Sequence, residues 1–282
     1  MRLSLARVQG RLRHAWERVR PLPRPRYIDA TPRAGAAAAP GVFQVPNLTT
    51  LATAAQSEEA IRFVAGLIDR LTPSEEIAGQ QAFYRLAQAQ FGRHFRYADL
   101  TTMLWAAATL IRPAAYLEIG VRRGRSACVV GATSLDCSIT GFDLWVDGYA
   151  GVPNPGPDFV KSELRAAGHR GDVEFVSGDS RRTVPAYLEQ HPEAFFDLIT
   201  VDGDHSTLGA ATDLANVLPR LKVGGIVVFD DIVRTPPLRR VWTRLVQRDS
   251  RFVTWEYTDD GDGIAAAIRI GDRPMLSWFA ET

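Results

Sequence analysis

The chain has 282 residues, of which 46% are hydrophobic and 23% are charged, and its formal net charge is +1. This composition supports a sizeable soluble core, and the charge argues against a nucleic-acid partner held by bulk attraction. Two cysteines cannot make a disulfide scaffold, and no apolar run approaches the roughly 18 residues of a membrane span. We therefore expect a cytoplasmic protein.

Residues 1–45 are expected to form a basic arm and a linker. The first 33 residues contain nine arginines against two acids, Glu17 and Asp29. Apolar residues recur at helical spacing from Leu5 to Val19, so a basic amphipathic helix that contacts a membrane surface or a partner is the alternative to a loosely ordered arm. The stretch TPRAGAAAAPG at 31–41 predicts the linker.

Residues 46–112 are expected to form a helical segment that covers the site or makes a homo-oligomer contact. An apolar stripe from Ile61 to Leu71 predicts one helix. The stretch Thr72-Pro73-Ser74-Glu75 predicts the start of a second helix, with Thr72 as its cap. A third helix is predicted over 98–111, before Pro113.

Residues 113–272 predict an α/β domain, and 273–282 a tail. Apolar runs at 115–119, 138–142, 173–176, 196–201 and 225–229 alternate with helical stretches near 125–135, 158–167, 181–190, 205–218 and 237–248. This alternation is typical of a mostly parallel, Rossmann-like sheet. The stretch DDGDG at 259–263 joins two further strand-like runs, which predicts an antiparallel C-terminal hairpin.

A glycine turn follows the first predicted strand in YLEIGVRRGRSA. A dinucleotide fingerprint requires Gly-x-Gly-x-x-Gly, whereas here Arg122 intervenes and the spacing is Gly120-x-x-x-Gly124, which argues against a nicotinamide oxidoreductase. Glycine permits a close backbone approach and positive φ, and the helix that follows offers free N–H groups to an anionic group. We expect Arg122 and Arg125 to be solvated loop residues.

Acids end the later strands in order: Asp143, Asp179, Asp202, and the pair Asp230-Asp231. Each follows an apolar run, so each is predicted to lie at the carboxyl-end rim, where open α/β sheets bind ligands. Two glycines alone are a weak indication, but this ordered set is hard to obtain by chance.

The ordered set resembles class I S-adenosylmethionine-dependent methyltransferases over roughly 95–270. The resemblance implies that Glu118, Gly120 and Gly124 hold the methionine end of the cofactor, with Ser126 near its carboxylate. It also implies that Asp143 binds the ribose, and that Asp179 and Ser180 meet the adenine. The loop at 144–158, with Trp145 and Tyr149, is a candidate lid.

The last acids predict chemistry beyond cofactor binding. Asp202, Asp230 and Asp231 are expected to converge on one hard cation, by default Mg²⁺. His205 follows Asp202 by three residues at the start of a helix, which would keep its imidazole neutral and make it a candidate general base. Asp202 is thus a candidate cofactor, metal and catalytic residue, whereas Asp204 is expected to face solvent or cap the helix.

The pattern Asp-Gly-x-His with a later Asp-Asp looks like metal-dependent O-methyltransferases of the sugar branch, and more distantly of the catechol type. In the catechol type an amide usually replaces Asp231, and its lysine base has no counterpart here. The implied function is methyl transfer to a hydroxyl of a small, sugar-like or natural-product-like molecule, with no nucleic-acid partner. A metal-independent methyltransferase and a non-catalytic cofactor-binding subunit remain the alternatives.

Overall fold

The computed structural model describes residues 47–148, 151, 153–259 and 261–272. The chain divides into two units, Met1–Val45 and Pro46–Thr282, and every described residue belongs to the second. The predicted basic arm, its amphipathic pattern, Tyr149 and the tail at 273–282 therefore lie outside the described residues.

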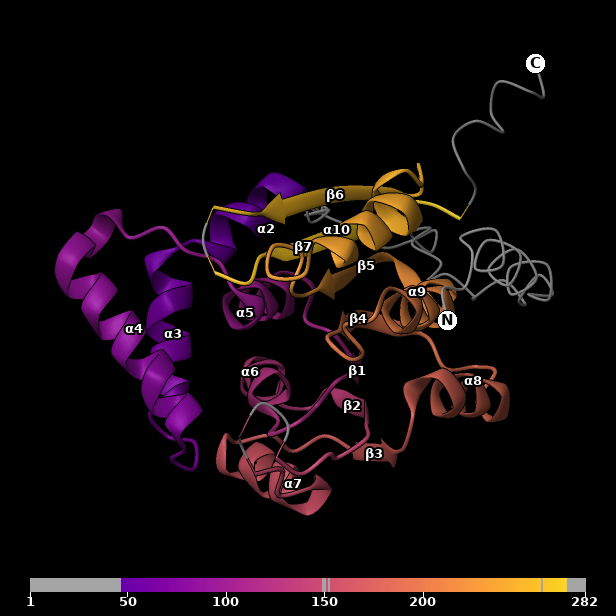
Figure 1. The fold of residues 1–282 in the computed structure, drawn as a ribbon, viewed down its shortest axis with the longest axis horizontal. Helices are drawn as coiled ribbons and strands as arrows, with labels where there is room; N and C mark the ends of the chain where they lie inside the picture. Colours follow the sequence, from indigo (N-terminus) through magenta and orange to yellow (C-terminus); the bar gives the residue numbers. More distant parts are fainter. Residues whose placement is uncertain (1–46, 149–150, 152, 260, 273–282) are drawn as a thin grey trace, which may run out of the picture. The chain divides into compact units, whose positions relative to one another are not determined.

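A seven-stranded sheet forms the centre of the second unit (Figure 1). Its order is β3-β2-β1-β4-β5-β7-β6. The first five of these strands are parallel, and β7 runs antiparallel to both β5 and β6. The mostly parallel sheet with a reversed C-terminal hairpin is confirmed. The strands are β1 (Ala115–Ile119), β2 (Ser138–Asp143), β3 (Val173–Ser177), β4 (Phe196–Val201), β5 (Leu221–Phe229), β6 (Phe252–Tyr257) and β7 (Ile264–Arg269).

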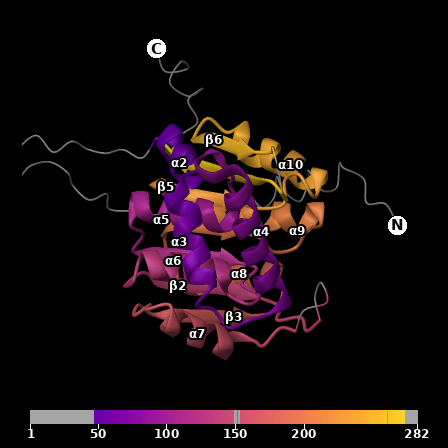
Figure 2. The ribbon, with the colours of Figure 1, turned by 90° about the vertical axis from the view of Figure 1, so that its left-hand side faces the viewer.

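Helices cover both faces of the sheet (Figures 1 and 2). One face carries α8 (Ser180–Gln190), α9 (Thr207–Val217) and α10 (Pro236–Trp242), and the other carries α5 (Leu100–Ile111), α6 (Arg125–Thr133) and α7 (Pro157–Ala166). Outside α5 and α6 lie α2 (Leu48–Ala55), α3 (Glu58–Ile68) and α4 (Glu75–Phe91). The described residues also form two short 3₁₀ helices, η1 (Gly92–His94) and η3 (Leu218–Arg220), and a short π helix, η4 (Thr243–Gln247). Among the described helices, none has the length and apolarity that crossing a bilayer requires.

α5 connects the N-terminal helices to the sheet. Its residues from Leu100 to Ala108 are all buried, and it packs against α2, α3, α6 and β5. Its N-terminus is fixed by a capping box in which Asp99 Oδ1 accepts from the Thr102 N–H at 2.8 Å and Thr102 Oγ1 accepts from the Asp99 N–H at 3.0 Å. One hydrophobic cluster therefore runs from Leu51 in α2 to Ile268 in β7.

The predicted start of the second helix is wrong by two residues. Ser74, not Thr72, caps α4, and its hydroxyl accepts from the Ile77 N–H at 3.2 Å. Thr72 instead donates through its N–H and its hydroxyl to the two carboxylate oxygens of Glu163 in α7, at 2.8 and 2.7 Å. These bonds tie the α3–α4 connection to α7. The helix α2 lies in the segment that is expected to be helical, although the sequence pattern predicts no individual helix there.

Candidate active site

The glycine turn after β1 is shaped by the chain's own packing. Gly120 has φ +93°, and a Cβ there would lie 1.9 Å from the Asp202 carbonyl oxygen. Gly124 has φ +75°, precedes the first residue of α6, and would place a Cβ 2.3 Å from Val160 of α7. The positive φ values are as expected. The close approach, however, is to the end of β4 and to α7, so both glycines serve to bring β1, β4 and α7 together at the rim.

Glu118 is a fully buried acid beneath this turn. Its Oε1 accepts a short hydrogen bond from the Ser126 hydroxyl. Its Oε2 is buried with no hydrogen-bond partner among the described residues. Burial, opposed in part by the Ser126 hydrogen bond, raises the pKa of Glu118 to about 8. The structure thus holds an unsatisfied acid at the place where the sequence predicted the cofactor's amino-acid end.

Asp143 ends β2 with both carboxylate oxygens oriented by backbone donors. Oδ2 accepts from the Arg122 N–H at 2.7 Å and Oδ1 from the Trp145 N–H at 2.5 Å. Each carboxylate oxygen has two lone pairs, so both retain capacity for a ligand hydroxyl. The carboxylate is therefore preorganised across the turns after β1 and β2.

The end of β3 carries a second polar corner. Asp179 caps α8 through the Arg181 N–H and forms an ion pair with the Arg181 guanidinium at 2.7 Å. Ser180 is the first residue of α8. Trp145, at φ +54°, donates from Nε1 to the Ser177 hydroxyl at 3.0 Å and packs edge-on against Phe175. Trp145 therefore joins the loop after β2 to the end of β3, while the rest of that loop includes residues outside the described ranges.

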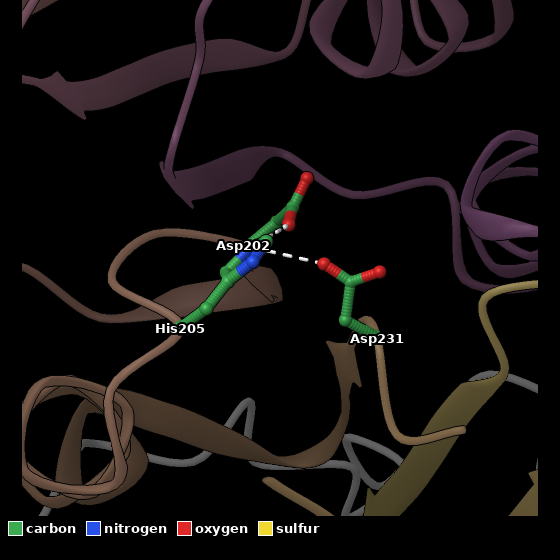
Figure 3. Close-up of side chains that lie close together, drawn as sticks. All are labelled: Asp202, His205 and Asp231. Carbon is green, nitrogen blue, oxygen red and sulfur yellow. Dashed lines mark ion pairs between the residues drawn. The ribbon is translucent and has the colours of Figure 1, made fainter. Parts of the chain in front are cut away.

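Three side chains from the ends of β4 and β5 form one cluster (Figure 3). His205 Nε2 lies 2.9 Å from Asp231 Oδ2 and 3.5 Å from Asp202 Oδ1. One potential ligand atom from each residue lies within 4.8 Å of the others. Asp231 has φ +62°, a strained conformation for a residue other than glycine, and such strain tends to gather at functional sites. The structure brings together two of the three predicted metal carboxylates with His205.

Asp230 lies next to this cluster but is not a member of it. Burial, together with the nearby carboxylates of Asp202 and Asp231, raises the pKa of Asp230 well above its ordinary value. Asp230 lines a second cavity with Asp99 and Gln80. Asp204 is exposed and accepts from the N–H and hydroxyl of Ser206, as the sequence suggested.

The expectation that a helix N-terminus lowers the pKa of His205 is wrong. Ser206 is the cap and α9 starts at Thr207, so His205 precedes the helix. The hydrogen bonds to Asp202 and Asp231 raise the pKa of His205 to about 11. The carboxylates therefore hold a proton on the imidazole in this structure.

Arg122 and Arg125 are not merely solvated, as the sequence suggested. Both guanidinium groups pair with Glu76 in the first turn of α4, at 3.3 and 3.2 Å. Leu71, Thr72 and Ile77 join Glu76 in lining a pocket with Gly120, Ser126 and Asp202. Nothing in the sequence pattern indicated this role for Glu76, because its partners are more than forty residues away.

Residues 117–232 match the model of a family described as a methyltransferase domain. This part of the chain is similar to a methyltransferase domain. The matched stretch begins in β1 and ends just after β5, so it contains Glu118, Asp143 and the whole cluster of Asp202, His205 and Asp231. The matched stretch thus supplies the rim, and α2–α5 precede it.

One curated relative is the 8-demethyl-8-(2,3-dimethoxy-alpha-L-rhamnosyl)-tetracenomycin-C 4'-O-methyltransferase of Streptomyces olivaceus. It is 30% identical over 145 residues, which are 42% of this chain and 53% of that protein. The chain therefore matches about half the length of this relative.

Solved methyltransferase structures share the fold. TomG, an O-methyltransferase from Streptomyces achromogenes solved with SAM, superposes with a TM-score of 0.52 and 20% identity over 77% of this chain and 97% of that chain. CalS11, described as a TDP-rhamnose 3'-O-methyltransferase, superposes with a TM-score of 0.50 and 24% sequence identity, and the match covers 76% of this chain and 94% of that chain. At these identities the likeness shows the fold alone.

Proposed function

We propose that the chain transfers a methyl group from S-adenosylmethionine to a hydroxyl of a small, sugar-like or natural-product-like molecule, with a divalent cation, by default Mg²⁺. The observation that carries the proposal is the cluster of Asp202, His205 and Asp231 beside the glycine turn. The tetracenomycin relative is named for O-methylation of a rhamnosyl compound, and TomG was solved with SAM. Both names favour this reaction and this cofactor.

The rim fits the cofactor. The unpartnered Oε2 of Glu118 suits the ammonium of a methionine end, and the Ser126 hydroxyl next to it suits the carboxylate. The oriented carboxylate of Asp143 suits two ribose hydroxyls. Asp179 and Ser180 would meet the adenine, although Arg181 must then share the Asp179 carboxylate.

The cluster also fits a hard cation. Asp202 and Asp231 offer carboxylate oxygens, which Mg²⁺ prefers, from two neighbouring strand ends. Asp230, whose pKa is raised by the same neighbouring charges, is a third candidate. Such a cation, when bound, would lower the pKa of an acceptor hydroxyl.

His205 is the candidate general base, and it must be neutral to accept a proton. The charges of Asp202 and Asp231 now hold a proton on its imidazole. For His205 to act as the base, the charges of these two carboxylates must be neutralised. A cation bound to them would do this, so the metal and the base belong to one hypothesis. If no cation binds at these carboxylates, the alternative is a metal-independent methyltransferase.

The test combines binding and turnover. Calorimetry with S-adenosylhomocysteine and, in parallel, NAD should show binding of the first alone. Methyl transfer to a panel of glycosides and phenols, followed by mass spectrometry, should then require Mg²⁺ and stop with a chelator. Turnover unchanged by the chelator would favour the metal-independent alternative, and binding of S-adenosylhomocysteine without transfer to any hydroxyl would favour a non-catalytic subunit.

A further inference from the structure

A second cavity, of about 240 Å³, opens beside Asp230. Gln80 and Phe83 of α4, Tyr97 and Asp99 before α5, and Asp262 in the β6–β7 turn line it together with Asp230. It shares Arg125 with the pocket at the glycine turn. Because Asp230 directly precedes Asp231, the cavity adjoins the cluster where the proposed reaction takes place.

One wall of this cavity is aromatic. The ring centroids of Phe83 and Tyr97 lie 4.8 Å apart, and Phe83 is 37% exposed. The Phe95 ring stacks on the Tyr97 ring with 5.7 Å between the ring centroids. The ring of Tyr257 in β6 contacts Tyr97 edge-on, with 6.0 Å between the centroids. These contacts fix the wall from both sides. A rigid, partly exposed aromatic surface suits the apolar face of a ring.

The polar lining offers mainly acceptors. The Gln80 Oε1 is buried and has no hydrogen-bond partner within the described part of the chain. The Gln80 Nε2 faces Asp99 at 3.5 Å, and Asp99 is held by the Tyr84 hydroxyl at 2.5 Å. Asp230 adds another carboxyl. Such a lining calls for a ligand that donates hydrogen bonds, as hydroxyl groups do.

The charge of the lining disfavours anions. Three aspartates, Asp99, Asp230 and Asp262, line the cavity with one cation, Arg125. The raised pKa of Asp230 favours its neutral form, and Asp262 also pairs with Arg234 at 3.4 Å, so Asp99 contributes most to the negative charge. Arg125 already pairs with Glu76 at 3.2 Å. A phosphate or carboxylate on the ligand would therefore meet net repulsion, since unpaired like charges at close range are costly.

We propose that this cavity binds the methyl acceptor as a neutral, polyhydroxylated ring, with one face on Phe83 and Tyr97 and hydroxyls donated to Gln80 and Asp230. The acceptor class is thus an uncharged glycoside and not a phosphorylated sugar. The inference rests on the proposed function, because it places the acceptor hydroxyl next to the cluster of that reaction.

The test compares matched probes on the full chain loaded with S-adenosylhomocysteine. Saturation-transfer NMR is recorded with the methyl α-glycosides of L-rhamnose and D-glucose and with the corresponding sugar 1-phosphates. We expect at least one methyl glycoside to bind, and at least about 10-fold more tightly than its 1-phosphate. Tighter binding of the phosphates, or no binding of either glycoside, would overturn the proposal.

Two variants locate the site. Phe83→Ala and Gln80→Leu should each weaken glycoside binding about 3- to 10-fold, because they remove a stacking ring and a buried acceptor. Phe91→Ala and Gln81→Leu are matched controls on the same helix, since Phe91 stacks on Phe95 and Gln81 donates to Asp69. Both controls should bind the glycoside as the wild type does.

Cofactor affinity separates the two hypotheses. All four variants should bind S-adenosylhomocysteine like the wild type. If the wild type fails to bind it, the proposed function is wrong. If the wild type binds S-adenosylhomocysteine but the Phe83 and Gln80 variants retain full glycoside affinity, the acceptor binds elsewhere. In that case the acceptor site is wrong and the proposed function stands.

Discussion

The imidazole of His205 donates to Asp231 across 2.9 Å and thereby joins loops that follow two different strands. Replacing His205 with alanine should slow the chemical step by roughly 10²- to 10⁴-fold, the range of a lost general base. The affinity for S-adenosylhomocysteine should stay nearly unchanged. Single-turnover kinetics and calorimetry measure the two effects. The control is His191→Ala, which changes the partly exposed histidine that caps the C-terminus of α8. Normal turnover in the His205 variant would remove this residue from the mechanism.

A metal ion should bind to the carboxylates of Asp202 and Asp231. Titration with Mn²⁺, followed by electron paramagnetic resonance, should show one site per chain in the wild type. Asp231→Asn should weaken it by at least about 10-fold, because a charged ligand is lost. Asp204→Asn should leave the Mn²⁺ affinity unchanged, since this exposed carboxylate accepts hydrogen bonds from Ser206. Equal Mn²⁺ affinity in wild type and Asp231→Asn would contradict the site.

Asp143 should control cofactor affinity. Asp143→Asn keeps the size of the side chain but loses the charge that the Arg122 and Trp145 N–H groups orient. We expect the affinity for S-adenosylhomocysteine to fall roughly 10- to 100-fold, the value of hydrogen bonds to a charged group. The control is Asp172→Asn. Asp172 is exposed and precedes β3, at the end of the sheet away from the carboxyl-end rim, so this change should leave the affinity for S-adenosylhomocysteine unchanged. An affinity equal to that of the wild type would exclude the ribose role.

Glu118 should make the cofactor-free protein less stable as the pH rises. Burial raises its pKa from 4.5 to about 8. Between these values the folded state retains a proton that the unfolded state has lost, so the free energy of unfolding falls with rising pH. One such proton contributes at most about 1.4 kcal/mol per pH unit.

The matching variant is Glu118→Gln, which cannot ionise. Urea unfolding between pH 5 and pH 8, values chosen to bracket most of this window, should show the variant gaining stability relative to the wild type as the pH rises. The exposed Glu189→Gln should show a constant difference. A constant difference for Glu118→Gln as well would mean that this carboxyl is ionised in the folded protein.

The strands and the acids at their ends were accessible from sequence because both signals are local. β1 and β4 begin and end at the predicted residues. β5 begins four residues early, at Leu221, because its pairing with β4 shifts between Phe196 and Leu198 near Gly224 and Gly225. A glycine pair that suggests a turn is here accommodated within a strand, which only the partner strand can reveal.

Long-range contacts explain the rest. Thr72 looked like a helix cap, yet its partner Glu163 is 91 residues away. The proton on His205 depends on Asp231, which follows the next strand. Gln80 and Phe83 belong to no sequence motif, and only the packing of α4 in the outer helical layer, beside α3, brings them to Asp230.

α4 reaches both ends of the proposed reaction. Glu76 holds the arginines of the glycine turn, and Gln80 and Phe83, about one and two helical turns further along, face the second cavity. At 1.5 Å per residue, the stretch between Glu76 and Phe83 spans roughly 10 Å. A bisubstrate inhibitor that joins the amino-acid end of the methyl donor to a hydroxylated ring would lie along this stretch, and a single rigid helix would set the spacing of its two halves.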